Sequence, residues 1–576
     1  RITAGKLSAA LHTLAHDDGG GVHSITDIVD GKIVRDILKE KHPSPEPADD
    51  TVHIPGEPPS QPHLVYFSGL GREAIRKAAL HTQGAEIWRH MCSNFADSSA
   101  TLCDALASCA RRMATAYIDP NSLTAFTACR LIALDKCPGV RPIGIGEVVR
   151  QIISKAILSI DSHAVQEAVG CDQLCAGLDC GIEVRVHVMQ SAFAEDDTDG
   201  IIMADASNTF NRLNQQVCLR NVQHLCPPLA TILINTYREP AHLYIDSECI
   251  LSKEGTTQGD PLAMHMYALG MLPLIRAAAG EETVQSWFAD DSSAAGRLNR
   301  VRQWWDVLTV QGPAYGYVVN PAKSVLVVKE HCLVEARDLF KDTGVAITTE
   351  GVRYLGAAVG TEAYKETYIQ RKVETWVQEV NRLATIAQTQ PQAAYSAFVS
   401  GLRGKWTFLC RTMDIPEHLL EPLEGAIRTK LIPALTCRSP PGGDLRRVFA
   451  LPCRLGGLGI TSPMSLCGQY NSSVRITEPL TSKILSGDTA LDDCSTKMRK
   501  MKAEVKADCE SLVKGRQRQW RTWSRFQNAS ASLRNVIDIA REKGSSSWLT
   551  CRPLKKYGFS LTKQEFWNRL CLRYGW

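Results

Sequence analysis

Three aspartates follow apolar segments, a position from which acidic side chains can gather a divalent metal ion. Asp205 comes directly after the apolar run 201–204, and Asp290 and Asp291 come after the β-compatible run 284–289. Two adjacent carboxylates at a turn between apolar strands repel each other unless a cation binds. Mg²⁺ is the natural cation because it prefers carboxylate oxygens together with substrate phosphates. The pattern therefore predicts a magnesium site.

Only tertiary folding can bring the three carboxylates together, because Asp290 lies 85 positions after Asp205. If they meet, two metal ions about 3.5–4 Å apart can clamp the attacking and leaving oxygens of a phosphoryl transfer. The alternative is that Asp290 and Asp291 form a solvated hairpin turn, since aspartate is a common turn residue.

The stretches around these aspartates resemble a known family. Residues 205–210 (DASNTF) resemble motif A of reverse transcriptases, residues 288–291 (FADD) resemble motif C, and residues 254–262 (EGTTQGDPL) resemble motif B. The order and the intervals also match, and the long motif B and the FADD form are most similar to non-LTR (LINE-type) retrotransposons. The resemblance implies an RNA-directed DNA polymerase, a nucleotidyltransferase that extends a DNA 3′ end.

Weaker matches extend the resemblance on both sides of these motifs. They are the fingers-like residues 134–136 and 141–143, the segment 173–177 before the palm, the motif-D-like residues 315–324, the primer-grip turn Tyr354, Leu355 and Gly356, and a downstream segment at 451–459. The resemblance is most specific over residues 130–360. One departure is that Gln83-Gly84-Ala85 runs straight into Glu86, so that a fingers loop typical of such elements is shortened.

The resemblance also implies roles for single residues. Asp205, Asp290 and the main-chain carbonyl of Ala206 would hold two Mg²⁺ ions, with Mn²⁺ as the alternative metal, and Asp291 would support them. Such a site would make the three aspartates the catalytic residues.

Five further residues would bind the incoming deoxynucleoside triphosphate. Lys136 and Arg141 would meet its phosphates, for which the planar guanidinium is well suited. Phe210 would exclude a 2′-hydroxyl by clash, Gln258 would contact the base and sugar, and Lys323 would protonate departing pyrophosphate. The plain alternatives are an exposed loop lysine for Lys136 and Lys323, a core ring for Phe210, and a helix-leading loop around Gln258. The alternative to phosphate binding is weaker for Arg141 than for Lys136, because Arg141 precedes Pro142 in an apolar stretch.

The length and composition of the chain predict several domains. The chain has 576 residues, 44% of them hydrophobic, and a net charge of only +4, so any basic nucleic-acid surface must be local. We expect an α+β right-hand polymerase of fingers, palm and thumb, with an antiparallel palm sheet carrying the aspartates. The expected parts are a helical arm and Pro-rich linker (1–62), fingers (63–195), palm (196–360), a helical thumb with the following segment (361–480), and a basic, truncated helical C-terminal region (481–576).

Local patterns refine that outline. Residues 1–40 predict two short helices around Gly19-Gly20-Gly21, and the dense prolines from Pro43 to Pro62 predict an extended linker. Residues 72–116 predict helices, and the apolar run 261–275 is too short to span a bilayer and predicts a buried helix. Apolar residues at helical spacing predict the thumb helix: Val373, Trp376, Val380, Leu383 and Ala387.

The basic stretch 497–525, with Trp520 and Trp523 interleaved, predicts a nucleic-acid contact or, alternatively, a solvated helical face. Cys171, Cys175 and Cys180 favour buried free thiols over a zinc site, which needs four ligands in tighter pairs. The chain starts without methionine and stops after Trp576, so we expect a fragment.

The expected partners are an RNA template, a DNA primer or target and deoxynucleoside triphosphates, with no membrane and no oligomeric state indicated. The resemblance implies target-primed synthesis in the nucleus after assembly in the cytoplasm. Two rival hypotheses stay open: a catalytically inactive retroelement remnant that binds nucleic acid, which the shortened fingers loop favours, and a viral RNA-copying polymerase, against which Phe210 argues.

Overall fold

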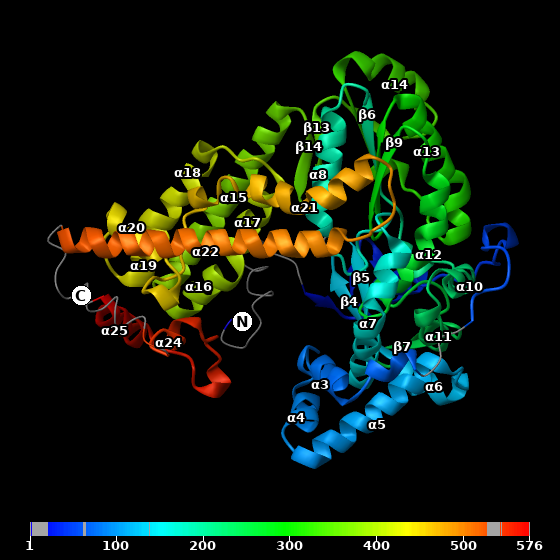
Figure 1. The fold of residues 1–576 in the computed structure, drawn as a ribbon, viewed down its shortest axis with the longest axis horizontal. Helices are drawn as coiled ribbons and strands as arrows, with labels where there is room; N and C mark the ends of the chain where they lie inside the picture. The colour runs from blue at the N-terminus through cyan, green and yellow to red at the C-terminus, as the bar shows by residue number, and fades with distance from the viewer. Residues whose placement is uncertain are drawn as a thin grey trace. The chain divides into compact units, whose positions relative to one another are not determined.

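The computed structural model describes residues 2, 21–60, 65–136, 139–526, 542, 544–574 and 576. Its contacts divide the chain into two compact units. The first unit comprises Gly21–Val352 and Pro479–Ser495, and the described part of the second consists chiefly of Arg353–Glu478 and Thr496–Trp576. All three predicted catalytic aspartates belong to the first unit. The expected mixture of helices and sheets is confirmed (Figure 1).

The first sheet of the first unit is built on the long hairpin of β4 (Cys129–Asp135) and β5 (Val140–Gly146). Strands β1 (Val22–His23) and β7 (Ala241–Ile245) both pair with β4, and β8 (Glu248–Ser252) pairs with β7. Leu134 is opposite Arg141 in the hairpin, so its turn holds Lys136 close to Arg141. The sheet therefore carries both residues expected to meet phosphates.

The prediction of two short helices in residues 1–40 is wrong for residues 21–33. That stretch forms β1 and a hairpin of β2 (Ile28–Val29) and β3 (Lys32–Ile33), and a helix, α2 (Val34–Lys41), comes only afterwards. The reason is the Asp30-Gly31 pair, whose φ angles of 50° and 77° are those of a two-residue hairpin turn between Val29 and Lys32. The first half of the prediction lies almost wholly outside the described residues.

The second sheet of the first unit carries the aspartates. Its five strands run in the order β12-β11-β6-β10-β9. Their bounds are β6 (Gly200–Ala204), β9 (Thr283–Phe288), β10 (Asp291–Gly296), β11 (Val325–Val328) and β12 (Ala346–Thr348). The first four pair antiparallel, as the palm prediction required, whereas β12 joins β11 in parallel.

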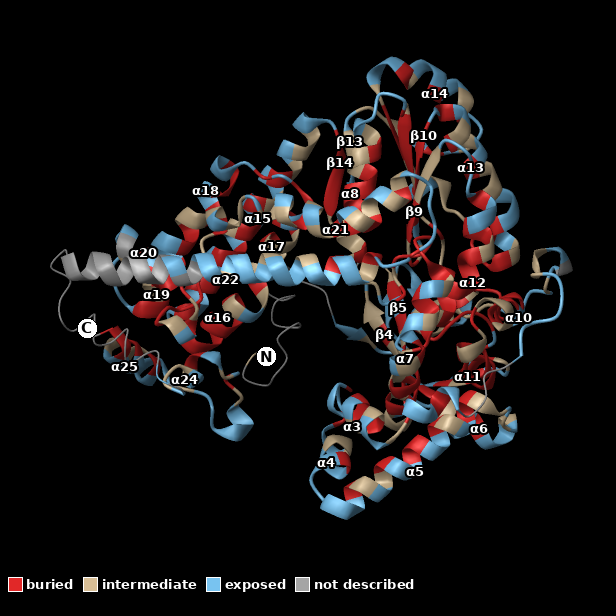
Figure 2. Ribbon diagram, viewed as in Figure 1, coloured by how far each residue is buried: buried red, intermediate tan, exposed pale blue. Residues whose placement is uncertain are grey.

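Helices cover both faces of this second sheet. On one face Arg185 of α8 (Gly181–Ala194) contacts Ser293, and on the other Trp304 of α13 (Leu298–Gln311) packs on Trp287. Figure 1 shows the two helices on opposite sides of the strands, and Figure 2 shows the strands coloured mainly as buried. A sheet covered on both faces explains why its strands read as continuous apolar or small-residue runs.

The remaining helices of the first unit enclose one large apolar core. The helices predicted between residues 72 and 116 are confirmed, and the apolar run after Pro261 forms the buried helix α12. The helices are α3 (Arg72–Leu80), α4 (Glu86–Ser93), α5 (Ala96–Thr115), α6 (Pro120–Thr127), α7 (Val148–Val169), α9 (Thr209–Arg212), α10 (Gln215–Leu225), α11 (Pro227–Tyr237), α12 (Ala263–Ala278) and α14 (Leu333–Leu339). The described part of the Pro-rich stretch holds one 3₁₀ turn, Asp50–Val52, and is otherwise irregular.

The second unit is mainly helical. A long helix of this unit, α15 (Glu362–Ala387), has an apolar face that is buried, so the predicted helical face is confirmed. The buried residues are Val373, Trp376, Val380, Leu383 and Ala387. Helix α15 follows the hairpin of β13 (Gly351–Tyr354) and β14 (Ala357–Gly360). The helices after it are α16 (Pro391–Ala397), α17 (Arg403–Thr412), α18 (Glu417–Ala426), α19 (Ile432–Thr436), α20 (Gly443–Ala450), α21 (Gln469–Leu485), α22 (Cys494–Phe526), α24 (Ser547–Thr550) and α25 (Lys563–Tyr574). Among the described residues, every helix is too short or too polar to cross a lipid bilayer.

Candidate active site

The register of β6 and β10 brings Asp205 and Asp291 to one end of the sheet. Ser292 of β10 is opposite Ala204 of β6, so Asp205 and Asp291 flank the last pair of the ladder. Asp290 lies in the tight turn between β9 and β10. Side chains that are 85 positions apart in the chain therefore converge where the sheet ends.

The turn that presents Asp290 is held from several sides. Ala289 has a φ of 54°, in the left-handed region that few non-glycine residues adopt. The fully buried Gln173 binds both main-chain groups of Ala289, accepting from its N–H (2.9 Å) and donating to its carbonyl (3.2 Å). Tyr317 donates to the Asp290 carbonyl (3.1 Å), and Thr209 donates to its carboxylate (3.2 Å). Such support keeps a strained turn in one conformation.

The pKa of Asp291 is affected by the charges of both other aspartates. Asp291 is exposed at the surface, but the surrounding protein atoms limit its hydration, and this loss of water raises its pKa. The charges of Asp290 and Asp205 raise the pKa further, while Arg185 opposes them. Arg185 is itself buried and donates to the main-chain carbonyl of Asp291 (2.5 Å). The effect of Asp290 and Asp205 on the pKa of Asp291 places the three negative charges in one region.

Asp205 is positioned by the chain that runs from Tyr317 to Ser324. The Asn320 N–H donates to the main-chain carbonyl of Asp205 (2.7 Å), and the Asp205 N–H donates to the Ser324 hydroxyl (3.1 Å). The Lys323 ammonium lies 4.0 Å from the Asp205 carboxylate, and both side chains are well exposed. The structure thus brings Lys323 and Asp205 together, and the role of Lys323 in proton transfer stays a prediction.

The main-chain carbonyl of Ala206 points away from the neighbouring segment around Val319. Ala206 is opposite Val319 in an antiparallel bridge, and the bonds Ser207 N–H to Val318 and Asn320 N–H to Asp205 lie on either side of it. In that pattern the bridged residue turns its own N–H and carbonyl away from its partner. The Ala206 carbonyl stays a predicted ligand, of the oxygen type that Mg²⁺ prefers.

A second group of potential metal ligands lies at the opposite end of β6. Among the described residues, Asp199, His331 and Cys332 are the three acidic, histidine or cysteine side chains whose ligand atoms all lie within 4.8 Å of one another. Both Asp199 carboxylate oxygens already accept hydrogen bonds, from Arg297 (2.9 Å) and from the N–H of Leu298 (3.2 Å). These hydrogen bonds indicate that Asp199 stabilises the fold. The predicted aspartates are a more open set whose oxygens do not all come within that distance.

The two predicted phosphate-binding residues share an electrostatic neighbour with Lys323. Lys136 and Arg141, on the β4–β5 hairpin, and Lys323 all act electrostatically on the ammonium group of Lys41 at the end of α2. Loss of water lowers the pKa of Lys41 most, and these three cations lower it further. Lys41 was not predicted, and no local sequence signal marks it, because α2 reaches this place only through its packing on the hairpin.

The motif-B-like loop packs directly on the segment that follows Asp205. Gly255 has a φ of 73°, and a Cβ there would come within 2.3 Å of the Asn211 backbone. The next residue, Thr256, donates its N–H to the Phe210 carbonyl (2.5 Å). Further along, the Gln258 carbonyl accepts from Gly144 of β5 (2.8 Å). Gln258 is half-buried, and its loop joins the two sheets of the site.

Phe210 is fixed by a second ring. It stacks on the buried Tyr267 of α12 with ring centroids 4.4 Å apart and planes inclined by 20°. Phe210 itself remains half-buried, so it has both a packing role and an accessible edge. The core alternative and the sugar-wall prediction are therefore compatible with the same placement.

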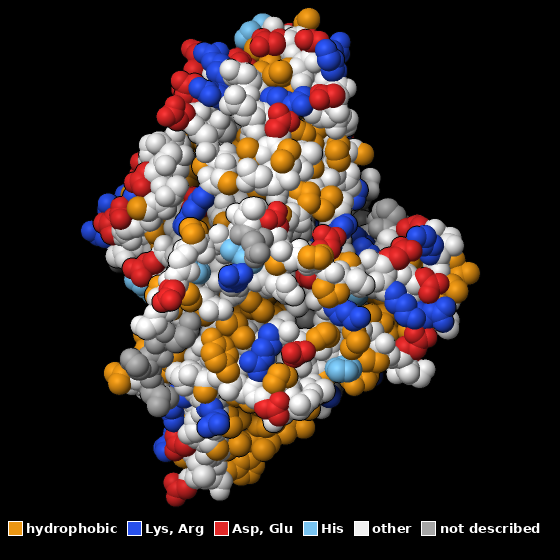
Figure 3. All heavy atoms as spheres, turned by 90° about the vertical axis from the view of Figure 1, so that its right-hand side faces the viewer, with side chains coloured by type: hydrophobic (Ala, Val, Ile, Leu, Met, Phe, Trp, Pro, Cys, Tyr) orange, Lys and Arg blue, Asp and Glu red, His pale blue; other side chains and the backbone are white. Residues whose placement is uncertain are grey.

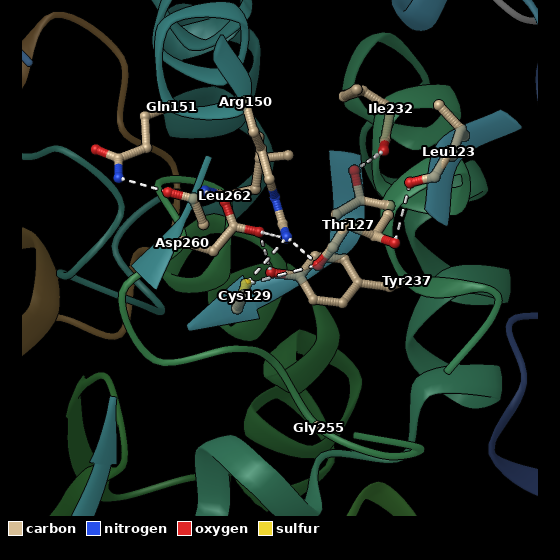
Figure 4. Close-up of polar contacts among 12 residues, drawn as sticks. Leu123, Thr127, Cys129, Arg150, Gln151, Ile232, Tyr237, Gly255, Asp260 and Leu262 are labelled. Atoms are coloured by element: carbon tan, nitrogen blue, oxygen red, sulfur yellow. Dashed lines mark hydrogen bonds and ion pairs between the residues drawn. The ribbon is translucent and has the colours of Figure 1, made fainter. Parts of the chain in front are cut away.

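A buried ion pair anchors the far end of the motif-B-like loop (Figure 4). Arg150 of α7 and Asp260 form a direct ion pair, with side chains 2% and 1% exposed. Asp260 also accepts from the Tyr237 hydroxyl (2.7 Å) and from the Leu262 N–H (3.0 Å). Burial raises the pKa of Tyr237, and the charge of Asp260 adds to this rise. The motif-B-like stretch includes Asp260, whereas no local sequence pattern marks Arg150.

The primer-grip residues lie in the second unit. Tyr354 is buried at the end of β13, and Leu355 and Gly356 form the turn to β14 with φ angles of 47° and 87°. The Gly356 carbonyl accepts from Tyr368 of α15 (2.8 Å). These residues therefore form a tight turn with positive φ angles. Contact with a primer stays a prediction.

The basic stretch 497–525 lies within α22. The side chains of Lys514 and of the residues from Arg516 onward, Trp520 and Trp523 included, lie outside the described part. On the face drawn in Figure 3, basic and acidic side chains are interspersed, as the small net charge suggests. Cys171 is buried and Cys175 is half-buried, and burial raises the pKa of each thiol to about 12.

No protein-family model and no curated protein matches the chain. Among solved structures it is similar to the apo telomerase of Candida tropicalis, with a TM-score of 0.36 and 10% identity over 66% of this chain and 69% of that one. It is also similar to the telomerase of Candida albicans in complex with a TWJ fragment of telomeric RNA, with a TM-score of 0.32 and 11% identity over 53% and 59% of the two chains. Likenesses of this size carry no argument about activity, which must come from the site itself.

Proposed function

We propose that this chain is an RNA-directed DNA polymerase that extends a DNA 3′ end by two-metal nucleotidyl transfer. The observation that carries the proposal is the meeting of Asp205, Asp290 and Asp291 at the end of β6 and β10. Three neighbouring carboxylates repel one another, and a divalent metal ion bound among them relieves that repulsion. The motif resemblance supplies the reaction class.

The residues at this site suit the steps of such a transfer. Bound Mg²⁺ or Mn²⁺ would neutralise phosphate charge and favour ionisation of the primer hydroxyl. Asp205, Asp290 and the Ala206 carbonyl would hold these ions, and the strain in the turn at Ala289 would keep Asp290 aimed at them. Asp291, with its raised pKa, would tune the charge of the set.

The surrounding residues would orient the nucleotide. Lys136 and Arg141 would bind the β- and γ-phosphate oxygens, and Lys323, beside Asp205, would donate a proton to departing pyrophosphate. The Phe210 ring, held by Tyr267, would clash with a 2′-hydroxyl and so select deoxynucleotides. Gln258, on the loop that Gly144 and Asp260 hold, would face the base and sugar.

Primer extension on an RNA template with Mg²⁺ and deoxynucleoside triphosphates tests the proposal. The wild type should extend the primer, and Asp290→Asn should not, while binding of the primer–template and the melting temperature persist. Extension by Asp290→Asn at the wild-type rate would contradict the proposal. Wild-type protein that binds RNA but never extends would favour an inactive remnant.

The viral RNA-copying alternative is distinguished by the sugar. Competing ATP against dATP in the same reaction should show strong preference for dATP if the Phe210 assignment holds. Preference for ATP would favour the viral alternative.

We further propose that the chain comes from a non-LTR retrotransposon and acts on element RNA and nicked chromosomal DNA in the nucleus. The supporting features are the long motif-B-like stretch 254–262 and the FADD form of residues 288–291. Extension from a nicked duplex, compared with extension from an annealed oligonucleotide, tests this finer proposal. Use of the annealed primer alone would count against it.

A further inference from the structure

Three cations lie within electrostatic range of a fourth, Lys41, and one of them, Lys323, lies beside Asp205. We call Lys41, Lys136, Arg141 and Lys323 the cation cluster. Lys136, Arg141 and Lys323 each lower the pKa of Lys41 by charge repulsion, which places all three within electrostatic range of it. Lys323 is in turn 4.0 Å from the Asp205 carboxylate. The cluster therefore extends from the β4–β5 hairpin to the proposed metal ligand.

The fold holds the end of α2, and with it Lys41, in this place. Val34 and Leu38 of α2 are fully buried in one apolar cluster with Leu131 of β4 and Val140 of β5. The last carbonyls of a helix lack partners within the helix. The carbonyl of Lys41 finds one in Asn208, whose side chain donates to it (2.9 Å) and which lies three positions after Asp205.

The positive charge of the cluster is poorly balanced. Within the described part of the chain, Lys41, Lys136 and Arg141 have no carboxylate within ion-pair range. Lys39, on the same helix, lies 3.6 Å from Glu248 instead. Lys41 is also half-buried, so it has lost part of its hydration without gaining an anionic partner. Such an arrangement favours the binding of a compact anion.

A nucleoside triphosphate fits the cluster better than a nucleic-acid backbone does. Its phosphates concentrate several negative charges in one small group, whereas each strand of a duplex carries one charge per about 3.4 Å. The cluster likewise concentrates its charges in one place, next to the carboxylate expected to hold a metal that bridges phosphates.

We propose that Lys41, contributed by the N-terminal helix α2, binds the phosphates of the incoming nucleoside triphosphate together with Lys136 and Arg141. This inference rests on the proposed polymerase function and adds to it a residue that lies outside the motifs of the resemblance. It makes the N-terminal segment part of the nucleotide site.

Single-nucleotide incorporation on an RNA template tests this with the wild type, Lys41→Gln, Lys41→Arg and, as the matched control, Lys39→Gln. Loss of one charge-assisted contact should raise the nucleotide KM about tenfold in Lys41→Gln, with kcat changed much less. Lys41→Arg should retain a KM near the wild type, and Lys39→Gln should match the wild type. In a complex with a chain-terminated primer, retention of the next nucleotide should weaken by the same factor in Lys41→Gln.

Three outcomes would overturn the inference. The first is a wild-type KM and wild-type nucleotide retention in Lys41→Gln, which leaves the polymerase proposal standing if Asp290→Asn is still inactive. The second is weaker primer–template binding with an unchanged KM, which would assign Lys41 to a backbone phosphate. The third is an equal change in Lys39→Gln, which would indicate a general charge effect. If the wild type neither extends a primer nor retains a nucleotide, the polymerase proposal fails as well.

Discussion

Asp260 and Asp205 belong to the same unit, yet their surroundings are opposite. Asp260 is 1% exposed and has three partners: the Arg150 guanidinium, the Tyr237 hydroxyl and the Leu262 N–H. Asp205 is 41% exposed, has two other carboxylates nearby, and is 4.0 Å from the exposed Lys323. The protein supplies the Asp260 carboxylate with an ion pair and hydrogen bonds, whereas the Asp205 carboxylate lies near like charges and remains partly in solvent.

This difference separates a structural charge from a functional one. A buried charge must be paired and hydrogen-bonded, or the fold loses several kcal/mol. A carboxylate kept beside others of the same sign costs stability, and that cost is recovered only when a cation binds. Substitutions should therefore affect stability at Asp260 and activity at Asp205.

Asp205→Asn gives the largest expected effect and tests the functional side of the comparison. Removing one metal ligand should reduce primer extension by at least about a thousandfold, which corresponds to roughly 4 kcal/mol of activation free energy. The melting temperature in EDTA should stay the same or rise, because one of three neighbouring negative charges is gone. A large fall in melting temperature would place Asp205 on the structural side instead.

Asp260→Ala tests the structural side. Leaving Arg150 buried without its partner should lower the free energy of unfolding by about 3–5 kcal/mol, measured by urea denaturation. Asp306→Ala is the matched control, because Asp306 pairs with Arg302 at the surface (2.9 Å), and its loss should cost less than about 1 kcal/mol. The double variant Arg150→Met with Asp260→Leu should recover much of the stability. Equal effects of Asp260→Ala and Asp306→Ala would remove the contrast.

Phe210→Ala sharpens the functional side by separating sugar selection from folding. Without the ring, discrimination against ribonucleotides should fall by up to about a hundredfold, since a steric pocket alone rejects a hydroxyl by that order. Tyr267→Phe keeps the stacked ring and should leave the selection intact. An unchanged ratio of dATP to ATP incorporation in Phe210→Ala would make Phe210 a core residue only.

Asp291→Asn should change the stability of the metal-free protein, and this is the smallest effect expected here. A pKa raised in the folded state means that ionisation of Asp291 disfavours the fold. Without metal, the wild type should therefore lose stability relative to Asp291→Asn as the pH rises through the folded pKa, by less than about 1 kcal/mol because the group is solvated. The two proteins should converge below the unfolded pKa of about 3.9. A wild type more stable than the variant at neutral pH would reverse the assigned sign.

The sequence predicted what depends on local pattern. The apolar runs before Asp205 and Asp290 form β6 and β9, and the helical face of Val373 and Val380 is buried in α15. These succeed because burial imposes periodicity on a short stretch of chain.

Features that depend on pairing across long distances were missed. Arg150 meets Asp260 across 110 positions, and Gln173 meets Ala289 across 116. Lys41 reaches the site because α2 packs on a hairpin that comes about a hundred positions later in the chain. The error at residues 21–33 has a local cause. The Asp30-Gly31 pair is itself a sequence signal for a hairpin turn, and it decides the structure against the predicted helix.

Metal-directed cleavage of the chain tests the central claim most directly. With Fe²⁺ in place of Mg²⁺, and ascorbate and peroxide to generate radicals at the bound ion, the backbone should break both near residues 203–207 and near residues 288–292. Asp205→Asn should lose both cuts together. Cleavage at one segment alone, or cuts near residue 290 that persist in Asp205→Asn, would show that the carboxylates do not share an ion and would contradict the account.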